Sequence, residues 1–211
     1  MQQRTPEWFA ARLGKATASR TRDIVATTRS GGYTAGRKNY MAELTCERLT
    51  GQMAEQYVSV AMLDGIAREP KARAAYAFQA DVDVEEVGFI DHPTIPMCGA
   101  SPDGLVGSDG LVEIKCCNTA THLETLLTHK IDPAYVDQMQ MQMSVTGRRW
   151  VDFVSYDERL PEPMRLYVQR VPRDDKAIAK LELEVTQFLI DLDATVDLLK
   201  ARYLMRLEGA A

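Results

Sequence analysis

Two carboxylates and one amine lie close together in the stretch from residue 101 to residue 117. Glu113 and Lys115 are two positions apart in an apolar run, so both side chains point to the same face of a strand. Asp103 comes ten residues before Glu113, and a Gly-Ser-Asp-Gly turn over 107–110 lies between them. If the chain forms a β-hairpin around this turn, Asp103 folds back beside Glu113.

These side chains suit metal-assisted hydrolysis. Two neighbouring carboxylates repel each other, and a divalent cation relieves that repulsion. Carboxylate oxygens select hard ions such as Mg²⁺, for which Mn²⁺ can substitute. Such an ion polarises a phosphoryl oxygen and lowers the pKa of a bound water, while Lys115 orients that water or offsets developing charge. The alternative is an ordinary turn residue at Asp103, with Glu113 and Lys115 on the solvent face of an amphipathic strand.

The composition is that of a packed globular domain. The chain has 211 residues, of which 45% are hydrophobic, and this predicts a single domain over residues 1–211. No apolar run approaches the roughly 20 residues that span a bilayer, and the N-terminus has no apolar signal-peptide core. The cysteines contain no Cys-x-x-Cys pair, which disfavours a zinc site or a disulfide framework. We therefore expect a cytoplasmic protein without a membrane partner.

Charge is distributed unevenly along the chain. The net charge is −5, but residues 1–40 carry eight basic and two acidic side chains, a local balance of +6 that leaves −11 for the remainder. Phosphate binding depends on local basic patches more than on net charge. The N-terminal region is therefore a candidate nucleic-acid surface, and a merely solvated surface is the alternative.

The surrounding pattern predicts an α/β fold. Helical signals cover these segments: 5–12, a helix beginning near 17–19, 38–50, 57–79, 119–130, 133–145 and a long C-terminal helix from 174 to about 207. Strand signals cover these: 82–84, 87–90, 111–114, 150–156 and 164–170. Pro70 predicts a kink or a break in its helix. The last helix packs across its own sheet or forms a subunit contact.

Four ordered motifs carry a resemblance to a known family. Pro102-Asp103, nine residues and then Glu113-Ile114-Lys115 are similar to the PD-(D/E)XK nuclease signature. The wider stretch resembles the phage lambda exonuclease and YqaJ-type viral recombinase family. The other matching motifs are Trp8-x3-Arg12-x4-Thr17-Ala-Ser19, Gly65-x3-Glu69 and Tyr135-x2-Gln138. The resemblance implies a restriction-endonuclease-like core, in which helices flank a central mixed β-sheet.

The resemblance also assigns metal and catalytic roles. It implies these metal ligands: Glu69, Asp103, Glu113 and Ile114. It implies these catalytic residues: Glu69, Asp103, Glu113, Lys115 and Gln138. Gln138 would hydrogen-bond the scissile phosphate or a catalytic water, and Gln140 takes that role if the helical register slips. From the residues alone, Glu69 is an ordinary surface residue and Gln138 belongs to a polar helix face.

A second group of residues is implied to contact DNA. The matching arginine and serine of the family hold the terminal 5′-phosphate, and these are Arg12 and Ser19 here. Local pattern alone favours helix capping by Thr17 or Ser19. Tyr135 and Met62 match further DNA-contacting positions, although a core methionine is the simpler interpretation of Met62. The family arginine that follows the catalytic lysine has no counterpart in 116–130.

The function implied by the resemblance is a Mg²⁺-dependent 5′→3′ double-strand DNA exonuclease. Such an enzyme releases 5′-mononucleotides and leaves 3′ single-stranded overhangs for phage-type recombination by single-strand annealing. The family also implies a homotrimeric ring around DNA, an annealing protein as partner and the cytoplasm of a bacterial host. One alternative is a structure- or site-selective DNA endonuclease of the same superfamily. A non-catalytic DNA-binding subunit is an alternative of another class.

Overall fold

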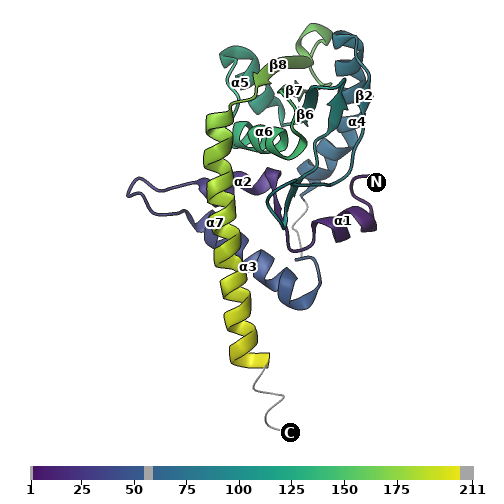
Figure 1. The fold of residues 1–211 in the computed structure, drawn as a ribbon. Coiled ribbons are helices and arrows are strands. Elements are labelled where there is room, and N and C mark those ends of the chain that lie inside the picture. Colours follow the sequence, from purple (N-terminus) through teal and green to yellow (C-terminus); the bar gives the residue numbers. More distant parts are fainter. Residues whose placement is uncertain (1, 55–58, 205–211) are drawn as a thin grey trace.

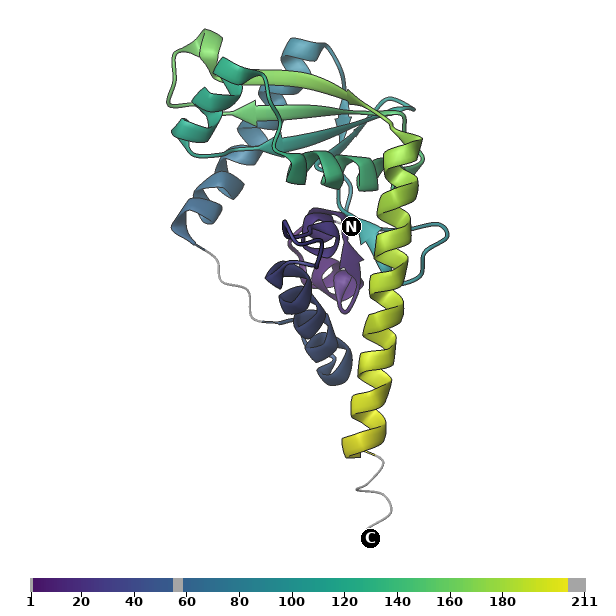
Figure 2. The same ribbon diagram turned by 90° about the vertical axis from the view of Figure 1, so that its left-hand side faces the viewer.

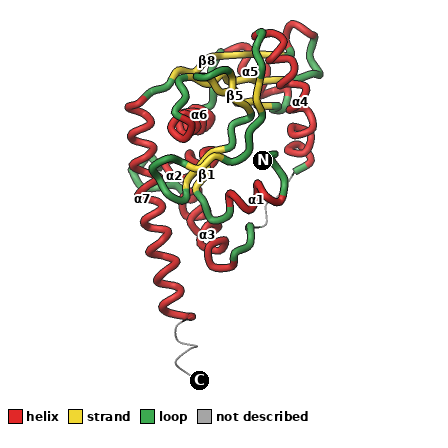
Figure 3. The backbone as a smooth tube through the Cα atoms, turned by 45° about the vertical axis from the view of Figure 1, so that its right-hand side comes forward, coloured by secondary structure: helices red, strands yellow, loops and turns green. Residues whose placement is uncertain are grey.

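The computed structural model describes residues 2–54 and 59–204, which form two β-sheets and their covering helices (Figures 1 and 3). The strands are β1 (Ala16–Thr17), β2 (Val84–Glu85), β3 (Ile90–Asp91), β4 (Cys98–Ala100), β5 (Gly104–Val106), β6 (Gly110–Lys115), β7 (Trp150–Tyr156) and β8 (Leu166–Pro172). The α-helices are α1 (Pro6–Arg12), α2 (Thr21–Val25), α3 (Ala35–Thr50), α4 (Val60–Ala80), α5 (Thr119–Thr128), α6 (Pro133–Thr146) and α7 (Asp175–Leu199). Short 3₁₀ turns occupy Ala18–Arg20 (η1) and Glu162–Met164 (η2). No helix of the described residues is long and apolar enough to cross a membrane.

The larger sheet is mixed and has β6 at its centre. Its strand order is β2-β5-β6-β7-β8, with β6 and β7 parallel and the other neighbours antiparallel. A parallel pair needs a crossover connection, and α5 and α6 supply it. A smaller sheet, β1-β4-β3, lies beside it, and β4 leads directly towards the hairpin of β5 and β6. The predicted α/β fold with a central mixed sheet is confirmed.

Helices cover both faces of the larger sheet. On one face, Ala72 and Tyr76 of α4 pack against Val112 and Ile114 of β6. On the other face, an apolar cluster joins α6 to β6 and β7 through Leu111, Met139, Met143, Val151 and Phe153. Because alternate residues of a strand point to opposite faces, Glu113 and Lys115 share the α6 side with Leu111.

Helix α6 is buried on more than one side, which explains why its sequence has no clear amphipathic period. Met139 and Met143 pack on the sheet, whereas Met141 and Val145 belong to the cluster that holds α3 and α7. Figure 2 shows α6 between the larger sheet and the N-terminal helices. The predicted helix over 133–145 is confirmed despite its strand-like alternation of Gln and Met.

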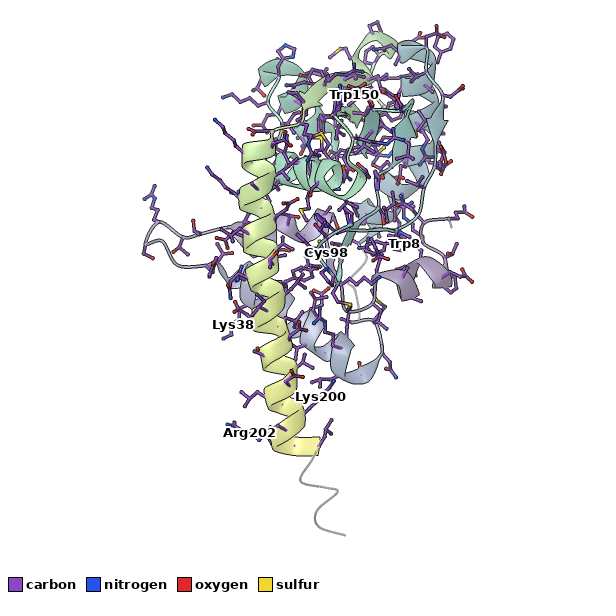
Figure 4. The ribbon with its side chains drawn as sticks, viewed as in Figure 1. Trp8, Lys38, Cys98, Trp150, Lys200 and Arg202 are labelled. Carbon is purple, nitrogen blue, oxygen red and sulfur yellow. The ribbon has the colours of Figure 1, made fainter. Side chains whose placement is uncertain are left out.

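Two expectations about the long elements need correction. Of the kink or break predicted at Pro70, the break is wrong, because helix α4 continues through this residue. Helix α7 packs mainly along α2, α3 and α6 rather than across the sheet, because α6 already covers that face; only Ile178 joins the sheet cluster. The helix ends at Leu199 and a π-helical turn continues over Lys200–Leu204, with Lys200 and Arg202 beyond the rest of the molecule (Figure 4). The expected extension beyond residue 204 lies outside the described residues.

Candidate active site

The hairpin of β5 and β6 brings Asp103 beside the Glu-x-Lys motif. Leu105 pairs with Leu111 and Gly104 with Val112, so the residue before β5 lies opposite the second half of β6. The Asp103 Oδ2 atom accepts a hydrogen bond of 2.6 Å from the Ile114 backbone N–H. The placement expected from the sequence is therefore confirmed.

Glu113 is the most enclosed acid of this group, with 2% of its surface exposed. Its Oε1 atom lies 2.6 Å from the Lys115 Nζ and accepts a hydrogen bond of 2.6 Å from the Gln138 Nε2. Its Oε2 atom accepts a bond of the same length from the Gln142 Nε2. A buried carboxylate is stable only when paired and hydrogen-bonded, and this network meets both needs.

Lys115 is held as a cation. Its Nζ also donates to the Gln138 Oε1 at 3.3 Å and lies 4.6 Å from the centroid of the Tyr135 ring. Burial lowers the pKa of Lys115, but the negative charges of Glu113 and Asp103 outweigh this and raise the pKa above its usual range. The side chain therefore donates hydrogen bonds and offsets negative charge, and it is a poor general base.

Asp103 has an excess of negative charge around it. Removal from water raises its pKa well above the ordinary range, and the charges of Glu113 and Glu69 raise it further. A divalent cation relieves such a repulsion, and the carboxylate donors are those that hard ions prefer. The Ile114 side chain packs in the apolar cluster below α4, so only its carbonyl oxygen is suited to join Asp103 and Glu113 at an ion. The donor set thus fits Mg²⁺.

The Glu69 carboxylate is already paired with arginines and is not free to act as a third metal ligand. Its Oε2 atom lies 2.6 Å from the Arg4 Nη2, and its Oε1 atom accepts a hydrogen bond of 3.3 Å from the Arg73 Nη2. Consistent with this pairing, residues 2–54 and 59–204 contain no group of three His, Cys, Asp or Glu side chains that could hold a metal ion. The structure brings Asp103 and Glu113 together, whereas Arg4 and Arg73 form ion pairs with Glu69 of α4.

Sequence reasoning missed Gln142, Arg73 and Arg4. Gln142 follows Gln138 by one helical turn, so the two share a face of α6, and this spacing was an available signal. Arg73 follows Glu69 at the same spacing, which is typical of a helical ion pair. Arg4 has no comparable local signal, because 65 residues separate it from Glu69. Gln140 instead bonds the Pro172 carbonyl, so it is not an alternative to Gln138.

Arg12 and Ser19 line one pocket, as expected for a phosphate site. The pocket has a volume of about 590 Å³, and its other polar lining residues are Lys15, Thr17, Arg20, Tyr40, Glu43 and Glu47. Burial lowers the pKa of the Arg12 guanidinium, and the side chain stacks 4.1 Å from the centroid of the Trp8 ring. Met62 also lines the pocket and is 52% exposed, so the interpretation as a core methionine is wrong. Ser19 belongs to η1, and neither Thr17 at the N-cap of η1 nor Arg20 at the N-cap of α2 forms a side-chain capping bond, so capping by Thr17 or Ser19 is wrong.

The pocket and the acidic cluster are joined by short connections. Trp8, on the inner side of α1 (Figure 4), donates from its Nε1 to the Ser101 Oγ at 2.9 Å, two residues before Asp103. Strand β1, next to η1, pairs in parallel with β4, which leads into the same stretch. Arg12 of the pocket is thus connected through the Trp8 ring to the stretch that leads into Asp103.

Comparison with known families settles the relationship of the chain. The model of the YqaJ-like viral recombinase domain matches residues 7–149, a span that contains all four motifs. The chain belongs to the YqaJ-like viral recombinase family. The predicted resemblance is thereby confirmed, and the match covers the hairpin, α4, α6 and the pocket residues. A comparison with curated protein sequences finds no match.

Solved structures support the same YqaJ-like assignment. The chain is 53% identical to an alkaline exonuclease, LHK-Exo, from Laribacter hongkongensis, with a TM-score of 0.89 over 95% of this chain and 99% of that one. A structure of LHK-Exo with dAMP matches at the same identity and coverage with a TM-score of 0.90. A phage-related exonuclease from Haemophilus somnus 129PT shares the fold at 17% identity, with a TM-score of 0.70 over 87% of this chain and 95% of that one.

Proposed function

We propose that this protein is a Mg²⁺-dependent 5′→3′ exonuclease of double-stranded DNA. It releases 5′-mononucleotides and leaves 3′ single-stranded overhangs for recombination by strand annealing. The observation that carries the proposal is the hairpin that places Asp103 beside Glu113, with the Lys115 Nζ 2.6 Å from the Glu113 carboxylate. The likeness to an alkaline exonuclease supports a nuclease, and the complex of that relative with dAMP supports a mononucleotide product.

Each residue of the cluster has a distinct task in the proposed reaction. Asp103, Glu113 and the Ile114 carbonyl would hold Mg²⁺, which polarises the scissile phosphate and acidifies a water molecule when bound. The Lys115 ammonium donates a hydrogen bond towards the attacking water or the phosphate and offsets charge that develops in the transition state. Gln138 and Gln142 fix the Glu113 carboxylate, so that its orientation needs no rearrangement during the reaction.

The pocket of Arg12 and Ser19 would bind the 5′ end of the degraded strand. A guanidinium pairs with a phosphate through two parallel hydrogen bonds, and the Ser19 hydroxyl adds a donor. Met62 would contact the end of the duplex from the pocket edge and Tyr135 would contact DNA beside Lys115. Two fixed points, the pocket and the cluster, would define which phosphodiester is cut.

The proposed assembly is a homotrimeric ring, with an annealing protein as a partner in the bacterial cytoplasm. In support of a subunit contact, α7 exposes these large apolar side chains: Leu183, Ile190 and Leu198. Exposed apolar groups along one helix commonly mark protein–protein contacts. A closed ring would keep the enzyme on DNA without tight binding.

The proposal predicts that Asp103→Ala abolishes digestion while DNA binding persists, because the variant loses one of two adjacent carboxylates. The assay is the digestion of linear duplex labelled at either end, with and without Mg²⁺, beside closed circular DNA. Release of label from 5′ ends only, with intact circles, is expected. Cleavage of circles would indicate an endonuclease, and full binding with no Mg²⁺-dependent digestion by the wild type would indicate a DNA-binding subunit.

Arg12→Gln is predicted to weaken digestion of 5′-phosphorylated ends selectively. Loss of a charge-assisted contact of roughly 1.5–3 kcal/mol lowers kcat/KM by about 10- to 100-fold. Substrates with a 5′-hydroxyl end should lose much less, since they lack the phosphate. An equal loss on both ends would contradict the assignment of this pocket.

A further inference from the structure

Arg4 holds an oxygen of Glu69 that a metal would need. The Arg4 Nη2 lies 2.6 Å from the Glu69 Oε2, while 42% of the Arg4 side chain and 12% of the Glu69 side chain are exposed. The other oxygen faces Arg73, which also pairs with Glu86 at 2.9 Å. Arg73 is therefore fixed by its own helix and by a second acid, and Arg4 is the partner that can leave.

The turn before α1 is built to present Arg4 at this point. The Gln3 Nε2 donates to the carbonyl oxygens of Val87 at 3.0 Å and Pro102 at 2.8 Å, so the turn is tied to the residue before Asp103. Arg4 itself has a φ of +65°, in the left-handed region that a residue with a Cβ seldom adopts. Such a conformation persists only where the surrounding contacts impose it.

The charges of the neighbouring carboxylates explain why Arg4 pairs with Glu69 when no metal is bound. The negative charges of Glu69 and Glu113 both act on Asp103, and Glu113 is paired with Lys115. Arg4 supplies a positive charge to Glu69 when no metal is present. A divalent ion at the same carboxylates would repel the guanidinium, and the half-exposed side chain can move into water at small cost.

We infer that Arg4 is the resident cation of Glu69 and that metal binding displaces it. This inference rests on the proposed function, because it presumes that the cluster binds a divalent ion. Arg4 thereby acts as a positioning residue that competes with the metal for the third carboxylate. It keeps Glu69 in a defined place without metal and lowers the affinity of the site.

The test is a titration of the full chain with Mn²⁺ in the absence of DNA, with free Mn²⁺ measured by electron paramagnetic resonance. Arg4→Gln is expected to tighten binding about fivefold, the factor that corresponds to a partly exposed ion pair. Arg4→Lys retains a charge and is expected to fall between the wild type and Arg4→Gln. Lys71→Gln is the charge-matched control, since Lys71 lies on α4 but pairs with Glu158.

A second readout is the thermal unfolding temperature with and without Mn²⁺. Arg4→Gln should unfold at a lower temperature than the wild type without metal, and saturating Mn²⁺ should close this gap. The inference is overturned if Arg4→Gln binds Mn²⁺ no more tightly than Lys71→Gln. If neither the wild type nor any variant shows saturable Mn²⁺ binding, the metal site of the proposed function is overturned as well.

Discussion

At the level of single residues, the catalysis proposed for this cluster depends on how firmly Glu113 is held. Two glutamines of α6 donate to opposite oxygens of its carboxylate, each at 2.6 Å. One of them, Gln142, is fully buried, and its own Oε1 has no hydrogen-bond partner. A buried amide with one unsatisfied atom lowers the stability of the protein. The hydrogen bond from Gln142 to Glu113 offsets this cost and gives Gln142 a role at the site.

Gln142→Met is predicted to lower kcat by roughly 10- to 100-fold, the usual effect of removing a partner of a metal-binding side chain, which is the role proposed for Glu113. The Glu113 Oε2 loses its donor, while the similar volume of Met preserves the packing of α6. The free energy of unfolding should also fall, because the buried Glu113 Oε2 is left without this donor, and removal of the unsatisfied amide oxygen offsets part of that cost. Initial rates on linear duplex and urea unfolding of the same samples would measure both effects.

Gln140→Met is the matched control for this experiment. Gln140 bonds the Pro172 carbonyl and the Asp174 backbone N–H, both at 2.9 Å, where β8 meets α7. Its replacement should lower the free energy of unfolding by about 1–3 kcal/mol and leave the activity of the folded protein intact. Equal loss of activity in both variants would contradict a specific role for Gln142.

At the level of elements, the hairpin of β5 and β6 is the part that assembles the site. Its turn contains Gly107 with a φ of +52°, and the register that follows sets Asp103 opposite Glu113. Gly104 lies at the entry to β5, directly after Asp103. A Cβ atom there would stand 2.2 Å from a methyl of Val84 and 3.1 Å from a methyl of Val112, so the strand can approach β2 only with glycine.

Gly104→Ala is predicted to destabilise the protein by about 1–3 kcal/mol, the cost of forcing a methyl group into a packed site. It should also lower nuclease activity in the fraction that remains folded, because the shift of β5 moves Asp103. Gly107→Asn is the control, since no atom lies within 4 Å of the added Cβ and Asn tolerates a left-handed backbone. If Gly104→Ala changes neither stability nor activity, β5 can move without disturbing the site.

At the level of the whole molecule, His92 ties the small sheet to two helices. Its Nδ1 accepts hydrogen bonds from the backbone N–H groups of Thr94 at 3.2 Å and Ile95 at 3.0 Å. Its Nε2 lies 2.9 Å from the Ser144 Oγ of α6, and that hydroxyl donates to Glu182 of α7. Protonation of the ring at Nδ1 would break both backbone bonds.

This connection predicts that stability falls in mild acid. Burial lowers the pKa of His92, although the charge of Glu182 opposes the shift. Because the unfolded chain then binds the proton more readily, stability is fully present above the unfolded pKa of roughly 6.5 and is lost as the pH falls from there towards the lowered folded pKa.

Urea unfolding at pH 7.5 and 5.5 would measure the loss, which should be smaller for His92→Asn than for the wild type. Asparagine keeps an acceptor for the two backbone N–H groups but cannot be protonated. His129→Asn, at an exposed position that terminates α5, should lose as much free energy of unfolding between the two pH values as the wild type. If His92→Asn loses as much stability between the two pH values as the wild type, residues other than His92 cause the acid sensitivity.

The elements were predictable where local rules decide them. Alternation over 111–114, the turn over 107–110 and the spacing of Asp103 are all contained within one short stretch. The helix of Gln138 was also predictable from its terminal signals, because Pro133 begins it and Gly147 ends it in the left-handed region. Of the kink or break expected at Pro70, the break does not occur, since packing of Ala72 and Tyr76 on the sheet holds α4 together despite the lost hydrogen bond.

The sequence by itself therefore determined the hairpin and the chemistry of its side chains, because the residues involved lie in one stretch of thirteen residues, from Asp103 to Lys115. Only the tertiary structure decided what surrounds them. The pairing of Arg4 with Glu69 spans 65 residues and the bond from Gln142 to Glu113 spans 29, so both depend on how distant elements dock, the turn before α1 on α4 and α6 on the sheet. Docking is governed by the burial of many apolar groups at once, whereas strand register is governed by one turn and its neighbours.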